Sequence, residues 1–319
     1  MRINYFGYFL KHRNRDERVL FDLRDILKSF CKLNNNQYKS NFKYSDEHIF
    51  ISHQVGDVYL FLMTRSHEII KKINTNDLSV DDIQDLLNQN EKLGFASYIL
   101  LKENYFSFGS TLLAPKFQVF ADYINKILHS LNISDYEFAV EPLLHQATRS
   151  EIVKMPFLGR ATIEIDKENS LTRDIINVVR CKSEDVEDIE SIEIIIKPKR
   201  SKSIKPAVEK FIDSIEDKGL QKMIIKAKNE THSQLTELYL IGQGAISDII
   251  GSVKEESISG VLETKADENQ YLINKLSEFR KNERFEEADI SHIVRFANLD
   301  SWTDLVPELR QDREELCVS

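Results

Sequence analysis

The first half of the chain alternates between strand-like and helix-like hydrophobic patterns. Residues 48–53 and 58–63 predict two strands that a turn at 54–57 joins into a hairpin. Apolar residues at helical spacing follow Pro115, which predicts a helix that begins there. Ser-Val-Asp-Asp at 79–82 predicts another helix, because Ser79 is a suitable N-cap. The pattern indicates an α+β domain with mainly antiparallel strands over residues 1–150.

A second α+β domain is predicted over residues 151–250. Ile163 and Ile165 alternate with Glu164 and Asp166, which is typical of a half-buried strand. Residues 192–196 predict a further strand. Apolar and basic residues alternate over 222–228, so a strand there would present a row of lysines on one face, with residues 235–241 as its antiparallel partner. Residues 251–319 are predicted to form a helical, acidic C-terminal region.

Charge separates the second half of the chain into a basic and an acidic region. The 319 residues carry a net charge of −9, which excludes a uniformly basic nucleic-acid binder but not a local basic face. Residues 197–228 contain ten bases and four acids, whereas residues 253–319 contain nine bases and sixteen acids. The acidic region either keeps the protein in solution or folds back to screen the basic surface.

The sequence predicts a cytoplasmic protein. Its apolar runs are far shorter than the roughly 20 residues of a membrane span, and the N-terminus lacks the pattern of a signal peptide. The three cysteines are far apart and form no Cys-x-x-Cys pair, so neither a zinc site nor a disulfide framework is expected: Cys31, Cys181 and Cys317.

No strong catalytic motif is present, and we predict neither an enzyme nor a cofactor or metal. The nearest match to a metal-dependent nuclease is Glu164 and Asp166 with Lys167, because two carboxylates on one strand face beside a lysine can hold a metal ion. A solvated strand face explains the same residues, and we favour that interpretation.

The basic segment has the properties of a phosphate site. Five cations fall within nine residues: Lys197, Lys199, Arg200, Lys202 and Lys205. Ser203 is placed to cap the helix that follows, and Pro206 falls at an early helical position. A helix N-terminus flanked by cations attracts phosphate. The strand that carries Lys222, Lys226 and Lys228 could extend this surface, although a solvated loop at a strand end is the alternative.

Several segments together resemble the RexA family of phage exclusion proteins. The most specific is Ile-Ile-Ile-Lys-Pro-Lys at 194–199. The other matching segments lie at 79–83, 93–95, 140–143, 155–162, 224–228 and 235–240. Their order and spacing cover roughly residues 1–245. The resemblance fades beyond about Gly251, so no family role is carried onto the acidic end.

The resemblance implies a two-domain α+β homodimer that binds double-stranded DNA without sequence specificity and changes its domain arrangement to do so. It implies a role in phage exclusion alongside a small membrane protein encoded nearby, and no enzymatic activity. Arg160, in a Phe-Leu-Gly-Arg stretch of the resemblance, is either a phosphate ligand or an ion-pair partner, and Gly159 suggests a close backbone approach or a bulge. The predicted DNA contacts are Lys197, Lys199, Arg200, Lys202, Lys205, Lys222, Lys226, Lys228 and Arg160. The alternative is a protein-interaction adaptor that works with a membrane partner and does not bind DNA.

Overall fold

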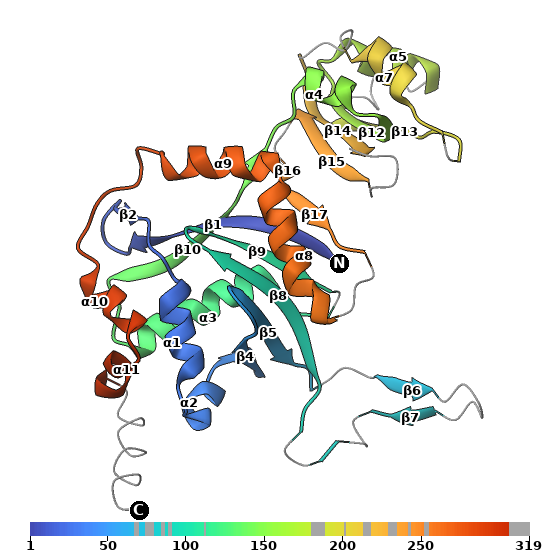
Figure 1. The fold of residues 1–319 in the computed structure, drawn as a ribbon. Coiled ribbons are helices and arrows are strands. Elements are labelled where there is room, and N and C mark those ends of the chain that lie inside the picture. Colours follow the sequence, from blue (N-terminus) through green and yellow to red (C-terminus); the bar gives the residue numbers. More distant parts are fainter. Residues whose placement is uncertain are drawn as a thin grey trace, which may run out of the picture. The chain divides into compact units, whose positions relative to one another are not determined.

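The structure is a computed structural model, and the chain in it divides into two compact units (Figure 1). Unit 1 comprises Met1–Pro142 and Ile250–Ser319, and unit 2 comprises Leu143–Ile249. The helical region that the sequence separates as residues 251–319 is therefore grouped with the N-terminal unit. The residues described are 1–66, 70–73, 80–83, 87–88, 91–111, 113–179, 189–200, 202–212, 218–228, 235–241, 244–251 and 255–305.

Unit 1 is built on an antiparallel sheet, which confirms the predicted α+β class. Its strands lie in the order β10 (Tyr136–Pro142), β1 (Arg2–His12), β9 (Tyr105–Ser110), β8 (Gly94–Lys102), β5 (Val58–Thr64), β4 (Glu47–His53) and β3 (Lys43–Tyr44). The short β2 (Arg18–Val19) also pairs with β1. Pro142 ends an edge strand, which suits a residue that cannot donate a ladder hydrogen bond.

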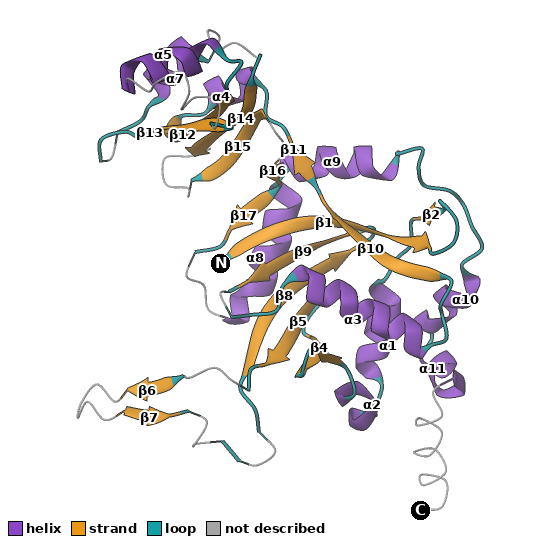
Figure 2. Ribbon diagram, turned by 180° about the vertical axis from the view of Figure 1, so that it is seen from behind, coloured by secondary structure: helices purple, strands orange, loops and turns teal. Residues whose placement is uncertain are grey.

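Helices cover both faces of this sheet (Figure 2). On one face, α1 (Arg24–Lys32) and α3 (Phe117–Ser130) pack with three C-terminal elements: α10 (Ser291–Val294), η2 (Arg295–Ala297) and α11 (Leu299–Leu305). These C-terminal elements contribute the fully buried Phe296 and Trp302. On the other face lie α8 (Glu255–Glu268) and α9 (Gln270–Arg280). Phe279 of α9 packs on Gly7, where a Cβ would lie 2.6 Å from the ring. The short α2 (Asn36–Ser40) follows α1.

Unit 2 contains a four-stranded antiparallel sheet in the order β13 (Ser191–Ile196), β12 (Phe157–Asp166), β14 (Leu220–Lys228) and β15 (Thr236–Ile241). The predicted strands in these ranges are thus confirmed. Its core lies between one face of the sheet and helices α4 (Arg149–Lys154) and α7 (Lys205–Phe211), with Ile163, Ile225 and Val208 fully or almost fully buried. Helix α5 (Ser170–Val179) follows β12, and β11 (Leu144–His145) pairs with β16 (Gly244–Ala245) ahead of β17 (Ser247–Ile249).

The helix predicted to begin after Ser79 does not begin there, although Ser79 itself and residues 84–86 lie outside the described residues. Residues Val80–Asp82 form strand β7, which pairs with β6 (Lys71–Ile73), and Lys71 and Asp82 form an ion pair of 2.8 Å. A local capping pattern does not reveal a strand partner that lies elsewhere in the sequence, and here the pairing overrides the local preference.

Cys31 is a free, half-buried thiol, and burial raises its pKa to about 11. Cys181 and Cys317 lie outside the described residues. Within the part of the chain that the structure describes, no helix has the length and apolar character needed to cross a membrane.

Candidate nucleic-acid interface

The unit 2 sheet has a second face that the core helices do not cover, and we call it the open face. Leu158, Ala161 and Ile163 point into the core between the sheet and α7, so their neighbours along β12 point the other way. The strand register adds residues from the other three strands. The open face carries Phe157, Arg160, Thr162, Glu164, Lys222, Ile224, Lys226, Lys228, Glu193, Ile195, Glu237 and Tyr239.

A β-bulge at Gly159 sets the direction of Arg160. Leu158 lies opposite Ala227 and Arg160 lies opposite Lys226, so Gly159 is the extra residue in β12. A Cβ at Gly159 would lie 2.8 Å from a methyl carbon of Leu235. The bulge and the close approach that the sequence suggested are therefore both present.

The basic loop, of which residues 197–200 and 202–203 are described, is fastened to β12 at both ends. It starts beyond Ile196, which lies opposite Ala161. At its other end, the Ser203 hydroxyl donates to the Leu158 carbonyl at 3.1 Å and accepts from the Leu158 N–H at 3.0 Å. The Ile204 N–H donates to the same carbonyl at 2.8 Å. The two anchor points, Leu158 and Ala161, flank the bulge that carries Arg160.

Ser203 is not the N-cap residue that the sequence predicted. Ser203 Oγ accepts from the Lys205 N–H at 3.1 Å, although Ile204 occupies the N-cap position of α7 and Pro206 lies in the first turn. Ser203 therefore serves mainly to hold the basic loop against β12.

Four cations of the loop reach solvent: Lys197, Lys199, Arg200 and Lys202. Lys202 N–H donates to the Lys199 carbonyl at 3.0 Å, which gives the loop a turn. No carboxylate among the described residues forms an ion pair with any of the four. Exposed cations without counter-charges are the groups that phosphate can neutralise, so this loop has the properties expected of a phosphate-binding segment.

Three further predicted contacts lie at the same end of the sheet as the loop. Arg160 faces Lys226, and Lys228 lies opposite Phe157 with its ammonium 5.4 Å from the ring centroid. Lys226 also forms an ion pair of 2.9 Å with Glu237 of β15, a counter-charge that the sequence pattern did not predict. The strand register, Lys226 opposite Glu237, is the signal that would have revealed it.

Two predicted contacts lie elsewhere. Lys222 is opposite Glu164, toward the other end of the β12–β14 ladder. Lys205 begins α7 on the core side of the sheet and forms an ion pair of 3.8 Å with Glu209, one turn along the helix. One end of the sheet carries Arg160, Lys226 and Lys228 and leads into the basic loop with Lys197, Lys199, Arg200 and Lys202. Lys222 lies toward the other end of the sheet, and Lys205 lies on its core side.

The carboxylates considered for a nuclease have local partners. Glu164 Oε1 accepts from the Ser191 hydroxyl at 3.1 Å. Asp166 Oδ1 accepts from the Glu168 N–H at 2.7 Å and shapes the turn that leads into α5. Across the described part of the chain, no group of three or more His, Cys, Asp or Glu side chains is placed to hold a metal ion.

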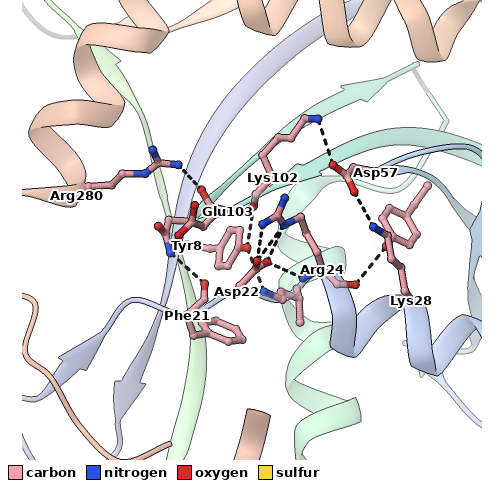
Figure 3. Close-up of polar contacts among 12 residues, drawn as sticks. Tyr8, Phe21, Asp22, Arg24, Lys28, Asp57, Lys102, Glu103 and Arg280 are labelled. Atoms are coloured by element: carbon pink, nitrogen blue, oxygen red, sulfur yellow. Dashed lines mark hydrogen bonds and ion pairs between the residues drawn. The ribbon is translucent and has the colours of Figure 1, made fainter. Parts of the chain in front are cut away.

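A second polar cluster lies in unit 1, and no motif in the sequence predicts it (Figure 3). The Asp57 carboxylate accepts from Lys28 of α1 at 2.9 Å and from Lys102 of β8 at 3.1 Å. Burial by itself raises the pKa of Asp57, but the hydrogen bonds and charges of the two lysines outweigh it, so its pKa is lowered. This carboxylate therefore joins the β4–β5 turn to a helix and to a second strand.

Neighbouring contacts extend the same cluster. Arg24 donates to both carboxylate oxygens of Asp22. Its Nε lies 3.0 Å from each of the two oxygens, and its Nη2 lies 2.6 Å from Oδ2. The Tyr8 hydroxyl donates to the Lys102 carbonyl at 2.8 Å, and burial raises the pKa of this tyrosine. Arg280 of α9 donates to the Glu103 carbonyl at 2.9 Å. The cations here are matched by carboxylates and carbonyls, which indicates a structural joint rather than a phosphate site.

Taken together, these features define a two-unit α+β protein of antiparallel sheets with an exposed cationic loop in its second unit. The family model RexA, described as an intracellular sensor of phage lambda and an Abi component, matches residues 1–235. The rexA proteins of Escherichia phage lambda and of Enterobacteria phage 434 are each 28% identical to the chain over 258 residues, which is 80% of this chain and 88% of each relative.

The chain belongs to the RexA family, and a RexA-like function in phage exclusion rests on that membership. All nine predicted contact residues lie within the range that the family model matches. The C-terminal helices that complete unit 1 lie beyond it.

Proposed function

We propose that the protein is a cytoplasmic, sequence-nonspecific binder of double-stranded DNA that acts in phage exclusion as a homodimer. The observation that carries the proposal is the basic loop: four exposed cations in a segment that the bonds of Ser203 fasten to Leu158, two residues before Arg160 in β12. Contacts of this kind reach the sugar–phosphate backbone and read no base, which accounts for binding without sequence preference.

Local geometry explains how a chain with a net charge of −9 can bind a polyanion. The loop concentrates its cations, and the guanidinium of Arg200 can donate two parallel hydrogen bonds to one phosphate. Each phosphate that is neutralised releases condensed counterions, so affinity should fall steeply as salt is raised. Lys226 and Lys228 support the loop from β14, with Lys226 partly neutralised by Glu237.

The proposal includes a change in the arrangement of the two units on DNA binding. The chain passes between the units twice, at 142–143 and at 249–250, and two single-chain connections of this kind permit rigid-body movement. One fluorophore on unit 1 and another on unit 2 should show a changed transfer efficiency when duplex is added. An unchanged efficiency at saturating duplex would remove this part of the proposal.

The test of DNA binding compares two double variants with the same change in net charge. Lys199→Ala/Arg200→Ala removes two cations of the basic loop, whereas Lys210→Ala/Lys218→Ala removes two exposed lysines elsewhere in unit 2. The first should weaken duplex binding in a gel-shift titration, and the second should bind like the wild type. If the first variant also binds like the wild type, or if wild type binds no duplex and instead retains a membrane protein in a pull-down, the adaptor function replaces the proposal.

A further inference from the structure

Strand β13 lies at the end of the unit 2 sheet and has one partner, β12. Among the described strands, none pairs with its outer edge. The strand is strongly apolar, with three consecutive isoleucines at 194–196, and Ile195 on the open face is 39% exposed. A free apolar edge is a template for another strand, and proteins that leave one uncovered risk aggregation.

We propose that the outer edge of β13 pairs antiparallel with β13 of a second copy of this chain, about a two-fold axis at Ile195. The two four-stranded sheets then form one continuous eight-stranded sheet. This inference rests on the homodimer proposed above and goes beyond it by assigning the surface and the strand register. A two-fold axis makes such an interface self-complementary, so the same residues must suit both sides.

The alternation of side chains limits the possible registers. Directly opposite residues in an antiparallel pair have their side chains on the same face of the sheet. The two-fold axis must therefore lie at a residue that pairs with its own symmetry mate, because an axis between two neighbouring residues would pair a core-facing residue with one on the open face. An axis at Glu193 would place two carboxylates opposite each other, and like charges in that position are destabilising. An axis at Ile194 would place Glu193 opposite the partner's Ile195 and leave the charge without a counterpart.

An axis at Ile195 satisfies charge and packing together. Glu193 then lies opposite the partner's Lys197, and the symmetry produces this pair twice. In the dimer, Lys199, Arg200 and Lys202 are then the cations of the basic loop that stay available to phosphate. On the core face, Ile194 lies opposite the partner's Ile196, which extends the layer of half-buried isoleucines that packs on the unit 2 core. Ile195 meets its own symmetry mate and becomes covered. Pro198, which has no N–H, limits the ladder to this strand.

A charge-swap series tests the pairing in the full-length protein by sedimentation velocity. Glu193→Lys and Lys197→Glu each create two like-charge pairs and should raise the dimer dissociation constant by about tenfold or more. The double variant Glu193→Lys/Lys197→Glu restores both pairs and should dimerise like the wild type. Single variants that dimerise like the wild type would show that the dimer does not form through the edge of β13, although the homodimer itself would be confirmed. A wild type that stays monomeric would overturn both, and the salt-dependent gel shift would still decide DNA binding.

Disulfide trapping tests the register independently of charge. In a background with Cys31, Cys181 and Cys317 changed to Ser, Ile195→Cys places two thiols at the axis, within the Cβ separation that a disulfide requires. The control Ile194→Cys faces the partner's Ile196 and should not cross-link with its own symmetry mate. A cross-linked dimer from Ile195→Cys alone supports the register. Equal cross-linking of both variants, or of neither in a protein that dimerises, would overturn it.

Discussion

Arg160 and Lys226 lie directly opposite each other across the β12–β14 ladder, so two like charges share one position on the open face of unit 2. Such a pair opposes folding. Glu237 offsets the charge of Lys226 through an ion pair of 2.9 Å, whereas the buried Nε of Arg160 has no hydrogen-bond partner among the described residues. A phosphate near Arg160 would compensate both charges, which fits the proposed interface.

The first prediction concerns the counter-charge at Glu237. Glu237→Gln should raise affinity for duplex DNA about threefold, because it frees Lys226 and removes a carboxylate that repels phosphate, a change of roughly 0.7 kcal/mol. The free energy of unfolding should fall by less than about 1 kcal/mol, as is usual for partly exposed ion pairs. Fluorescence anisotropy with a labelled duplex measures the affinity. An unchanged or weaker affinity in the variant would contradict the prediction that Glu237 restrains the contribution of Lys226 to binding.

The second prediction concerns the bond that holds the basic loop. Ser203→Ala leaves the Leu158 N–H without its hydroxyl partner and should destabilise unit 2 by about 1–2 kcal/mol. Duplex affinity should also fall, because the cations of the loop are no longer fixed in position beside Arg160. Ser203→Thr keeps a hydroxyl and is the matched control. If the alanine variant binds duplex as tightly as the threonine variant does, the loop needs no anchoring to bind.

The third prediction concerns acid stability. The pKa of Asp57 is lowered in the folded state, so its contribution to stability is present above the unfolded pKa of about 4 and is lost as pH falls through the lower folded value. Asp57→Asn should destabilise unit 1 by about 2 kcal/mol at neutral pH, because Lys28 and Lys102 are left without their shared carboxylate.

The same variant should show a weaker loss of stability than the wild type as pH is lowered from about 5 to about 3, the range in which carboxyl groups titrate. Urea denaturation followed by tryptophan fluorescence provides the measurement, because the single tryptophan, Trp302, is fully buried in unit 1. Parallel pH profiles for wild type and variant would contradict the role given to Asp57.

The fourth prediction concerns the C-terminal region. Truncation after Glu283 removes Ile293, Phe296 and Trp302, which are fully buried in the unit 1 core, and should prevent stable folding of that unit. Trp302→Ala alone should cost about 3–5 kcal/mol. Truncation after Leu305 retains all three side chains and should leave the melting temperature close to that of the full chain. The shorter deletion can therefore test whether the acidic end affects DNA affinity. A large drop in its melting temperature would contradict the prediction that the C-terminal contribution to the unit 1 core ends by Leu305.

Much of the fold was predictable because its signals are local. The alternation at 222–228 predicts β14 and places Lys222, Lys226 and Lys228 on one face, as the register confirms. Pairings between distant segments were not predictable from the same patterns. The cap pattern at Ser79 predicts a helix where strand β7 pairs with β6, and the Asp57 bridge joins three elements that no local motif connects.

The candidate site was predictable only in part, for the same reason. The cation cluster at 197–205 is visible in composition, but the structure places Lys205 on the core side of the sheet beside Glu209. The anchoring of the loop at Leu158 and the pairing of Lys226 with Glu237 depend on how strands are ordered in the sheet, which the sequence of any one segment does not specify.

The most direct test of whether the basic loop binds DNA is duplex affinity measured across a salt series. The series compares the wild type with the two charge-matched double variants. For wild type, the logarithm of affinity should fall linearly with the logarithm of salt concentration. Lys199→Ala/Arg200→Ala should lower the affinity and make that slope shallower by about 1 for each phosphate that the variant no longer neutralises, whereas Lys210→Ala/Lys218→Ala should leave both unchanged. Identical slopes and affinities for all three proteins would contradict the proposal that this loop binds DNA.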